Sequence, residues 1–409
     1  MVMPEPSQIY RNVRSMEPLL PKVQGAAMSE LSVRIIQKIG ELKKSIPSPV
    51  TRSEVARLVR EMNSYYSNLI EGHKTLPKDI EKALREDYSE RDEDRRNQML
   101  SVAHVKAEAA MRQWLEEVPD TDVYGQEFIC RLHQEFYSHI PKEEWFTTSR
   151  EGERHEIEPG KLRDHNVEVG AHIPPAHETL PGFLKKFSSF YSSDGITATH
   201  RLTAIAAAHH RLTWIHPFAD GNGRVARLQS QAAIIRAGLD CDGLWTLSRG
   251  LAREKACYYR ALHEADQPRM SDYDGRGNLS DGMLAGFCEF FLTQIHDQVA
   301  FMVDLVSPLN LIKRIEKYLR FERTELGEKT AGYYGRLLKE LCIQGEIPRG
   351  HVGGILGVSD STARKVIGSA LEDELIATRS EKGPIRIYFP EKVVESYFPR
   401  LFTDLPVGG

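Results

Sequence analysis

The sequence predicts a mainly α protein that ends in a small domain of helices and one hairpin. From residue 53 onward, apolar residues recur at steps of three and four, as on the buried face of a helix. After about residue 330, short helical patterns are followed by two alternating segments. The length of 409 residues suggests two or three domains. We expect a lead-in over residues 1–50, a helical domain over 51–306 and a C-terminal domain over 307–409.

The composition excludes several classes of protein. The chain has 54 Lys+Arg against 58 Asp+Glu, so a strongly basic nucleic-acid coat is excluded. The five cysteines are scattered and form no CxxC pair, which argues against a disulfide framework and a zinc knuckle. No run approaches 18 apolar residues, and the first 15 residues lack the apolar core of a signal peptide. We therefore expect a reduced, cytoplasmic protein with no membrane partner.

The first elements follow from proline and from helical periodicity. Prolines punctuate the lead-in, which leaves room for one helix over residues 28–44. A second helix is expected from Ser53, which can act as its N-cap. Residues 78–96 are crowded with both charge signs, as on a solvent-exposed helix face with ion pairs four residues apart.

The middle of the chain is predicted to be helical with one interruption. Residues 163–175 alternate, contain a glycine and end in two prolines, so we expect a short hairpin or an edge strand. A helix from residue 200 should end near residue 215, because Pro217 disfavours the helical conformation of the residue before it. A second helix begins near Asn222 and ends at Gly238. A loop over residues 267–282 then leads into another helix over 283–305.

The C-terminal pattern resembles a winged helix-turn-helix. Helices are expected over residues 334–343, over 351–356 and from a cap at Ser359 to residue 374. Strands over 376–379 and 385–389 would form the wing.

DNA is one partner that this resemblance implies. The third helix and the wing carry five basic residues that could face a phosphate backbone: Arg364, Lys365, Arg379, Lys382 and Arg386. Residues 330–400 nevertheless hold ten Lys+Arg against nine Asp+Glu, so little net charge remains to release counterions. Recruitment of a target protein or support of a dimer is at least as well favoured.

The chemistry is concentrated in residues 216–227, HPFADGNGRVAR, between two predicted helices. Glycines on either side of Asn222 let backbone N–H groups point into one concavity, and the helix N-terminus behind them adds partial positive charge. Arg224 and Arg227 have guanidinium groups that suit phosphate oxygens. Asp220 is a hard oxygen ligand of the kind that phosphate-bound Mg²⁺ takes. His216 is a proton acceptor near neutral pH, so the segment indicates a triphosphate site with a base.

This segment resembles the Fic signature, HxFx(D/E)GNGRxxR, with every defining position present. The resemblance covers roughly residues 50–300. It implies an all-helical fold, Mg·ATP as donor, and transfer of AMP to a Ser, Thr or Tyr hydroxyl of a protein. Members of the family often form homodimers, so a homodimer is also implied.

The resemblance also implies residue roles. His216 would deprotonate the target hydroxyl, and Asp220 would hold Mg²⁺ across the α- and β-phosphates. Arg224 would steady the leaving pyrophosphate, and Arg227 would bind the γ-phosphate. The phosphates would be cradled by Gly221, Asn222 and Gly223.

Two other segments resemble walls of the nucleotide site. Residues 167–175 resemble the family's flap, whose backbone docks a target segment and borders the nucleotide. The flap positions next to ATP would be Val169, Gly170, Ala171 and His172. The adenosine side would be formed by Tyr258, Tyr259 and Asp266. For the two tyrosines, ordinary helix packing is the alternative.

Residues 67–72, SNLIEG, resemble the family's inhibitory motif (S/T)xxxE(G/N), at the end of a helix over about residues 53–72. Ser67 and Glu71 occupy its defining positions. The Glu71 carboxylate could pair with Arg227 and occupy the guanidinium that should hold the γ-phosphate. In some members the same glutamate positions water that removes AMP from a modified target.

Three hypotheses follow from the sequence. The first is an AMP transferase that Glu71 inhibits. The second is a regulator in which the nucleotide site acts as a sensor and the wing binds DNA, although the intact His216 argues against a pure sensor. The third is an enzyme whose physiological reaction is AMP removal.

Overall fold

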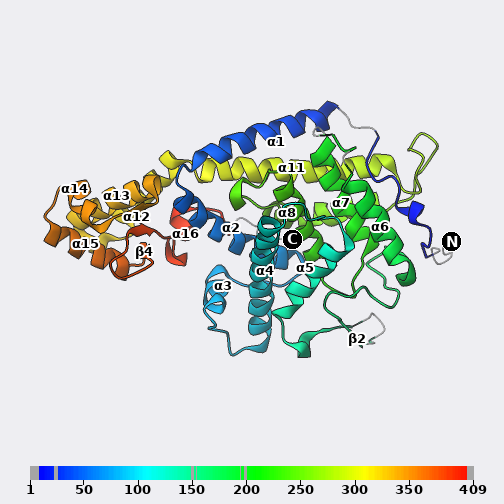
Figure 1. Cartoon of the computed structure of the whole chain (residues 1–409), viewed down its shortest axis with the longest axis horizontal. Coiled ribbons are helices and arrows are strands. Elements are labelled where there is room, and N and C mark those ends of the chain that lie inside the picture. Colours follow the sequence, from blue (N-terminus) through cyan, green and yellow to red (C-terminus); the bar gives the residue numbers. More distant parts are fainter. Residues whose placement is uncertain are drawn as a thin grey trace. The chain divides into compact units, whose positions relative to one another are not determined.

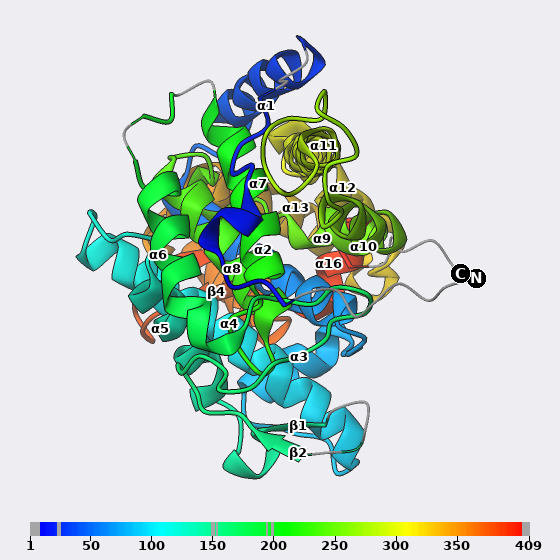
Figure 2. The same cartoon turned by 90° about the vertical axis from the view of Figure 1, so that its right-hand side faces the viewer.

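The computed structural model describes residues 9–22, 26–148, 152, 154–193, 195–197 and 200–402. Parts of the predicted lead-in (residues 1–8 and 23–25) and of the predicted C-terminal domain (403–409) lie outside the described residues. Helices dominate the described chain, with two small antiparallel sheets (Figures 1 and 2). The predicted fold class, mainly α with small hairpins, is confirmed.

The chain divides into two compact units that are discontinuous in sequence. One unit comprises residues 1–36, 63–240 and 247–297, and the other comprises 37–62, 241–246 and 298–409. Three of the divisions, after residues 36, 62 and 297, fall inside helices, so a single helix contributes residues to both units. The predicted boundaries at residues 50 and 306 stay predictions.

The first two helices are longer than the sequence pattern indicates. Helix α1 spans Ala26–Ser45, which extends the predicted range by one or two residues at each end. Helix α2 spans Pro49–Ile70, so the prediction that Ser53 caps it is wrong. Proline suits a first helical position because its missing N–H has no partner to lose there and its φ is already helical.

The core of the first unit is a set of packed helices. The predicted charged helix is divided into α3 (Pro77–Leu84) and α4 (Asp92–Glu117). Helices α7 (Arg201–Ile215) and α8 (Asn222–Arg236) pack on one another, and α8 also packs on α4 and on α5 (Gln126–Ser138). Both α7 and α8 are buried on nearly every face, so the loop between them is held from two sides.

The remaining helices of this unit frame that loop. Helix α6 (Leu180–Tyr191) packs on α7. Two short helices, α9 (Ser248–Arg253) and α10 (Lys255–Ala265), precede α11 (Asp281–Leu305). The predicted loop before α11 is confirmed and contains one antiparallel bridge, between Pro268 and Leu279.

The short hairpin or edge strand predicted over residues 163–175 is confirmed only in part, as a single tight antiparallel bridge. That segment contains only one bridge, Val169 with His172, around Gly170 with φ +65°. The side chain of Arg163 donates to the carbonyls of His165 and Pro175, so these groups need no strand partner. The hairpin of this region lies earlier in the chain, where β1 (Phe146–Thr148) pairs with β2 (Arg154–Glu156).

The second unit contains the three helices and the two paired strands predicted at the C-terminus, together with two further helices and a third strand that the sequence pattern does not indicate. Helices α12 (Pro308–Phe321), α13 (Gly327–Gln344) and α14 (Val352–Leu356) precede α15 (Asp360–Glu372), and α16 (Glu391–Tyr397) closes the unit. The cap is confirmed, because Ser359 Oγ accepts from the Thr362 N–H. The sheet has the order β3–β5–β4, from strands Glu346–Ile347, Ile385–Ile387 and Ile376–Thr378.

Within the described part of the chain, no helix combines the length and the apolar character that a membrane crossing requires.

Candidate active site

The loop between α7 and α8 is folded by its own residues. His216 ends α7 in the left-handed region, with φ +49°, and Gly221 precedes α8 with φ +78°. The side chain of Asn222 closes the loop, because Oδ1 accepts from the Phe218 N–H at 2.9 Å and Nδ2 donates to the Phe218 carbonyl at 2.8 Å. The predicted helix end and helix start on either side of this loop are confirmed.

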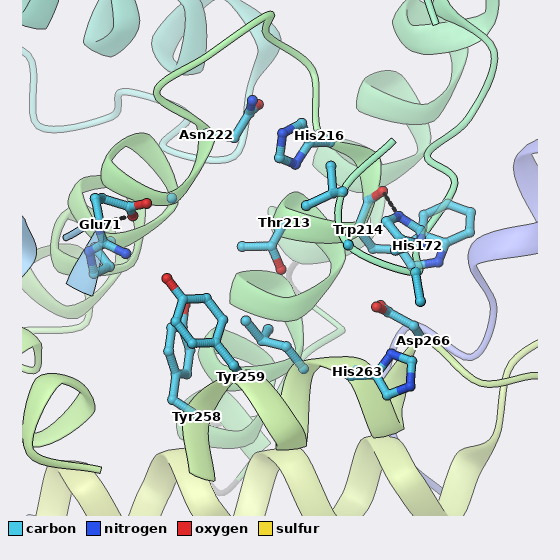
Figure 3. Close-up of a pocket in the computed structure, with 16 residues that line it drawn as sticks. Glu71, His172, Thr213, Trp214, His216, Asn222, Tyr258, Tyr259, His263 and Asp266 are labelled. Atoms are coloured by element: carbon cyan, nitrogen blue, oxygen red, sulfur yellow. Dashed lines mark hydrogen bonds and ion pairs between the residues drawn. The ribbon is translucent and has the colours of Figure 1, made fainter. Parts of the chain in front are cut away.

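A cavity of about 440 Å³ lies against this loop (Figure 3). Twelve residues predicted for the site line it: Glu71, Val169, Gly170, Ala171, His172, His216, Asn222, Gly223, Arg227, Tyr258, Tyr259 and Asp266. Sequence reasoning missed Thr213, Trp214, Leu262 and His263, which also line it. These four residues could have been found from helical spacing, because each lies within one helical turn of a residue that was predicted for the site.

The other predicted residues lie beside this cavity. Asp220 and Arg224 line a smaller adjoining hollow, together with Tyr137. The Tyr137 hydroxyl donates to Asp220 Oδ2 at 2.6 Å, whereas Arg224 Nη2 is 3.4 Å from the same oxygen. A Cβ at Gly221 would lie 3.1 Å from the Tyr137 ring, so the tyrosine leaves little room for a side chain at this position. Ser67 is fully buried behind Arg227.

Arg227 is bonded to the end of helix α2. Its Nε donates to Ser67 Oγ at 2.9 Å, and its Nη2 donates to the Ser67 carbonyl at 3.0 Å and to Glu71 Oε1 at 2.6 Å. A Cβ at Gly223 would collide with the Glu71 carboxylate. Only glycine therefore allows this carboxylate to lie against the turn that begins α8.

The charges of the site are set by burial and by the arginines. Burial opposes ionisation of Glu71 and Asp220, but the nearby guanidinium groups outweigh it and hold the pKa of both carboxyls below their usual values. Burial, with the charges of His172 and Arg163 adding to it, lowers the pKa of His216 to about 4. At neutral pH the His216 imidazole is therefore neutral and able to accept a proton.

Arg224 has unmet hydrogen-bonding capacity. Its side chain is buried, and among the described residues its Nε and Nη1 have no hydrogen-bond partner. A buried guanidinium with free donors is costly and fits a site for anionic oxygen atoms.

The residues next to Arg224 could bind a magnesium ion only if a bound phosphate supplied further oxygen ligands. No group of three His, Cys, Asp or Glu in the described ranges could hold a metal. Asp220 offers one partly exposed carboxylate, and Mg²⁺ is commonly held by one or two carboxylates together with substrate phosphates.

Arg163, which sequence reasoning did not place in the site, joins the loop to the flap segment. Its Nε donates to the His216 carbonyl at 2.9 Å, and its Nη2 donates to the Pro175 carbonyl at 2.5 Å. Its backbone N–H donates to the Pro217 carbonyl at 2.9 Å. One buried side chain thus sets the position of the histidine relative to the flap.

The opposite wall contains the two tyrosines and Asp266. Tyr258 is buried, and its hydroxyl shares a 2.7 Å hydrogen bond with His209 Nε2, so it both packs and lines the cavity. Tyr259 is 43% exposed and donates to the Ile70 carbonyl at 3.0 Å, one residue before Glu71. The Asp266 carboxylate pairs with His210 Nε2 at 3.2 Å.

Residues 123–232 match the Fic/DOC family. Two relatives named protein adenylyltransferase Fic are similar in sequence. That of Drosophila erecta is 42% identical over 82 residues, 20% of this chain and 17% of the relative. That of Nematostella vectensis is 40% identical over 87 residues, 21% of this chain and 20% of the relative. The similarity therefore spans a fifth or less of each relative's length.

Two solved structures share the fold. A Fic family protein from Desulfovibrio desulfuricans G20 aligns with a TM-score of 0.53 and 18% identity, over 91% of this chain and 98% of that one. A Fic domain-containing signalling protein from Bacteroides thetaiotaomicron aligns with a TM-score of 0.51 and 19% identity, over 67% and 96%. At these identities the likeness concerns the fold.

Proposed function

With a Fic domain in residues 123–232 as the premise, we propose that this chain is an auto-inhibited protein adenylyltransferase. It transfers AMP from Mg·ATP to a Ser, Thr or Tyr hydroxyl of a target protein, its own chain included. The observation that carries the proposal is the shared cavity of the His216 ring, the Gly223 turn and the Arg227 guanidinium.

The proposed reaction is an in-line displacement at the α-phosphorus. The acceptor oxygen forms a bond to this phosphorus, the bond to the bridging oxygen of the β-phosphate breaks, and pyrophosphate leaves. The acceptor's proton passes to the neutral His216 imidazole. Backbone N–H groups of residues 221–223 and the free donors of Arg224 stabilise the phosphate charge. Magnesium, when bound, neutralises further charge, and Asp220 is the residue that would hold it.

Inhibition is proposed to act through Glu71. The γ-phosphate and the Glu71 carboxylate would compete for Arg227, whose Nη2 is already 2.6 Å from Glu71. This contact supports placing the chain among Fic proteins with an N-terminal inhibitory helix. Ser67, which occupies Arg227 Nε, belongs to the same device.

AMP removal is the second candidate, because Glu71 and His216 line the same cavity. The anionic Glu71 carboxylate could orient a water whose oxygen bonds to the phosphorus of an AMP ester as the ester P–O bond breaks. The proton of that water would pass through the neutral His216 imidazole to the departing oxygen, which leaves as the free hydroxyl. The two reactions use the same residues, so their balance depends on where Glu71 lies.

The second unit is proposed to be a winged helix-turn-helix that recruits a target protein or supports a homodimer. Four of its predicted basic contacts are exposed: Arg364, Lys365, Arg379 and Lys382. Arg386 is only partly exposed and lies 3.9 Å from Glu54. With nearly balanced charge, DNA is the less favoured partner. Cytoplasmic location stays a prediction.

The deciding experiment is automodification of wild type and Glu71→Gly with Mg²⁺ and ATP labelled at the α- or the γ-phosphate. Label retained only from the α-position, and more strongly in the variant, supports AMP transfer and its inhibition together. Retention of γ-label would indicate kinase chemistry and contradict the proposal. Retention of neither would favour AMP removal or the regulator, and a modified target protein would be the next substrate.

A further inference from the structure

Residues 9–22, which we call the N-terminal strap, are hydrogen-bonded at several positions to the rest of the first unit. The strap contains one 3-10 turn, Val13–Met16 (Figure 2). Its backbone accepts hydrogen bonds from the Tyr191 hydroxyl at Leu19 and from the Leu279 N–H at Glu17, and it donates at Lys22 to Asp281. The lead-in predicted from the prolines is therefore an ordered part of the fold over these residues.

Tyr10 of the strap backs one wall of the active-site cavity. Its ring centroid lies 5.0 Å from that of Trp214, and its carbonyl accepts from the Ala176 N–H at 2.9 Å, directly after the flap segment. Trp214 lines the cavity, and its own carbonyl accepts from His172 Nε2 at 2.8 Å (Figure 3). Tyr10 thus packs on Trp214, and the Trp214 carbonyl in turn accepts a hydrogen bond from the flap residue His172.

Pro18 provides a second connection, to the wall that contains Asp266. The Pro18 carbonyl accepts from Arg211 Nε at 3.0 Å and from Nη2 at 2.8 Å. Arg211 is fully buried, and its Nη1 contacts His210 Nδ1 at 2.7 Å. Because arginine only donates, His210 accepts there and its Nε2–H donates to Asp266. Without the strap, Arg211 would lose the acceptor for two of its buried donors.

The two connections reach the same end of the cavity. Trp214, His172 and Asp266 lie together, whereas Glu71 and Asn222 lie on the opposite side (Figure 3). The phosphate-binding turn belongs to the Asn222 side, so the strap supports the end that a nucleobase would occupy.

We propose that the N-terminal strap is part of the nucleotide site and fixes its base-binding wall, with Tyr10 as the positioning residue for Trp214 and His172. The inference rests on the proposed nucleotide function. It requires that loss of the Tyr10 ring weakens binding of the base and leaves binding of the phosphates unchanged, because the ring packs on Trp214, at the end of the cavity away from Glu71 and Asn222.

The test measures binding rather than transfer. Full-length wild type, Tyr10→Ala, Tyr10→Phe and Arg11→Ala are titrated with a fluorescent ATP analogue and, by displacement, with ATP and with tripolyphosphate. Arg11 is the matched control, because it is the next residue of the strap and makes an exposed ion pair with Glu178. Tyr10→Ala should raise the Kd of ATP about three- to ten-fold, the range for loss of one aromatic pair. Tyr10→Phe and Arg11→Ala should stay within about two-fold of wild type.

The tripolyphosphate titration separates positioning from general damage. Its Kd should be the same in all four proteins. An unchanged Kd of ATP in Tyr10→Ala, or an equal loss of ATP and tripolyphosphate, would overturn the proposal for the strap. If wild type binds no nucleotide, the proposed function fails instead. Should Tyr10→Ala not fold, Tyr10→Leu removes the ring, keeps apolar volume and decides the question in the same way.

Discussion

Glu71 Oε1 lies 2.6 Å from Arg227 Nη2, and the same arginine is held through Nε by Ser67, one turn earlier on helix α2. Both acceptors come from one helix end, so the position of that end decides whether Arg227 is available to a ligand. Tyr259, which donates to the carbonyl of Ile70, holds this end in place. Glu71, Ser67 and Arg227 therefore form one connected group of hydrogen bonds, unlike an isolated ion pair on the surface.

Glu71→Gly should raise the rate of automodification about ten-fold or more. The change removes a charge-assisted hydrogen bond, which contributes about 1.5–3 kcal/mol, and returns Arg227 to the γ-phosphate. Incorporation of label from [α-³²P]ATP measures the effect. Glu93→Gln, which removes a carboxylate from the exposed start of α4, is the control and should leave the rate unchanged. A Glu71→Gly rate equal to that of wild type would mean that Glu71 is not inhibitory.

His216→Ala in the Glu71→Gly background should abolish transfer, by about 100-fold or more, and leave ATP binding intact. The pH profile of the active variant provides a second check. Because burial lowers the pKa of His216 to about 4, the ring is neutral above that pH. The contribution of His216 to the rate should be flat from pH 6 to 8 and should fall only as the pH approaches 4. A fall centred near pH 6.5, where an ordinary histidine titrates, would contradict the assigned environment.

Tyr137→Phe should raise the Mg²⁺ concentration needed for half-maximal transfer by about ten-fold. It removes the hydroxyl that donates to Asp220 Oδ2 at 2.6 Å, and a hydrogen bond to a charged group contributes about 1.5–3 kcal/mol. Asp220→Ala should abolish transfer at any Mg²⁺ concentration. The rate of automodification is measured as a function of Mg²⁺ concentration in the Glu71→Gly parent and in the same protein carrying Tyr137→Phe or Asp220→Ala. A Tyr137→Phe curve that superimposes on the parent curve would show that the tyrosine does not position Asp220.

The parts of the site that the sequence predicts are those built from neighbouring residues. Asn222 closes its loop on Phe218, four residues away, so the pattern of residues 216–227 already contains the geometry. The contact of Tyr137 with Asp220 spans 83 residues, and that of Arg211 with Pro18 spans 193. Neither contact can be recognised in a short stretch of sequence, because each depends on how distant parts of the chain pack together. For the same reason, the prolines of the strap indicate only a lead-in and not its contacts with Arg211 and Trp214.

The pairing predicted before α6 extends over fewer residues than the sequence pattern indicates, for a related reason. Alternation over residues 163–175 is typical of a strand, but a strand requires backbone partners. There, the carbonyls of His165 and Pro175 accept from the Arg163 guanidinium instead. Alternation of residue types alone cannot show that a side chain, and not a neighbouring strand, donates to these backbone carbonyls.

Arg163→Lys should therefore damage both stability and catalysis. The guanidinium donates to three carbonyls, those of His216, His165 and Pro175, and one ammonium cannot reach all three in the same geometry. At least one buried carbonyl would lose its partner, which costs about 1–3 kcal/mol and should lower the urea midpoint of unfolding. If the bond to the His216 carbonyl is lost or weakened, the proposed base is no longer held in place, and kcat for AMP transfer should fall more than KM for ATP rises. Arg154→Lys, at a solvent-exposed residue of strand β2, is the matched control and should change neither quantity. If Arg163→Lys lowered stability but left kcat intact, Arg163 would support the flap segment without positioning the proposed base.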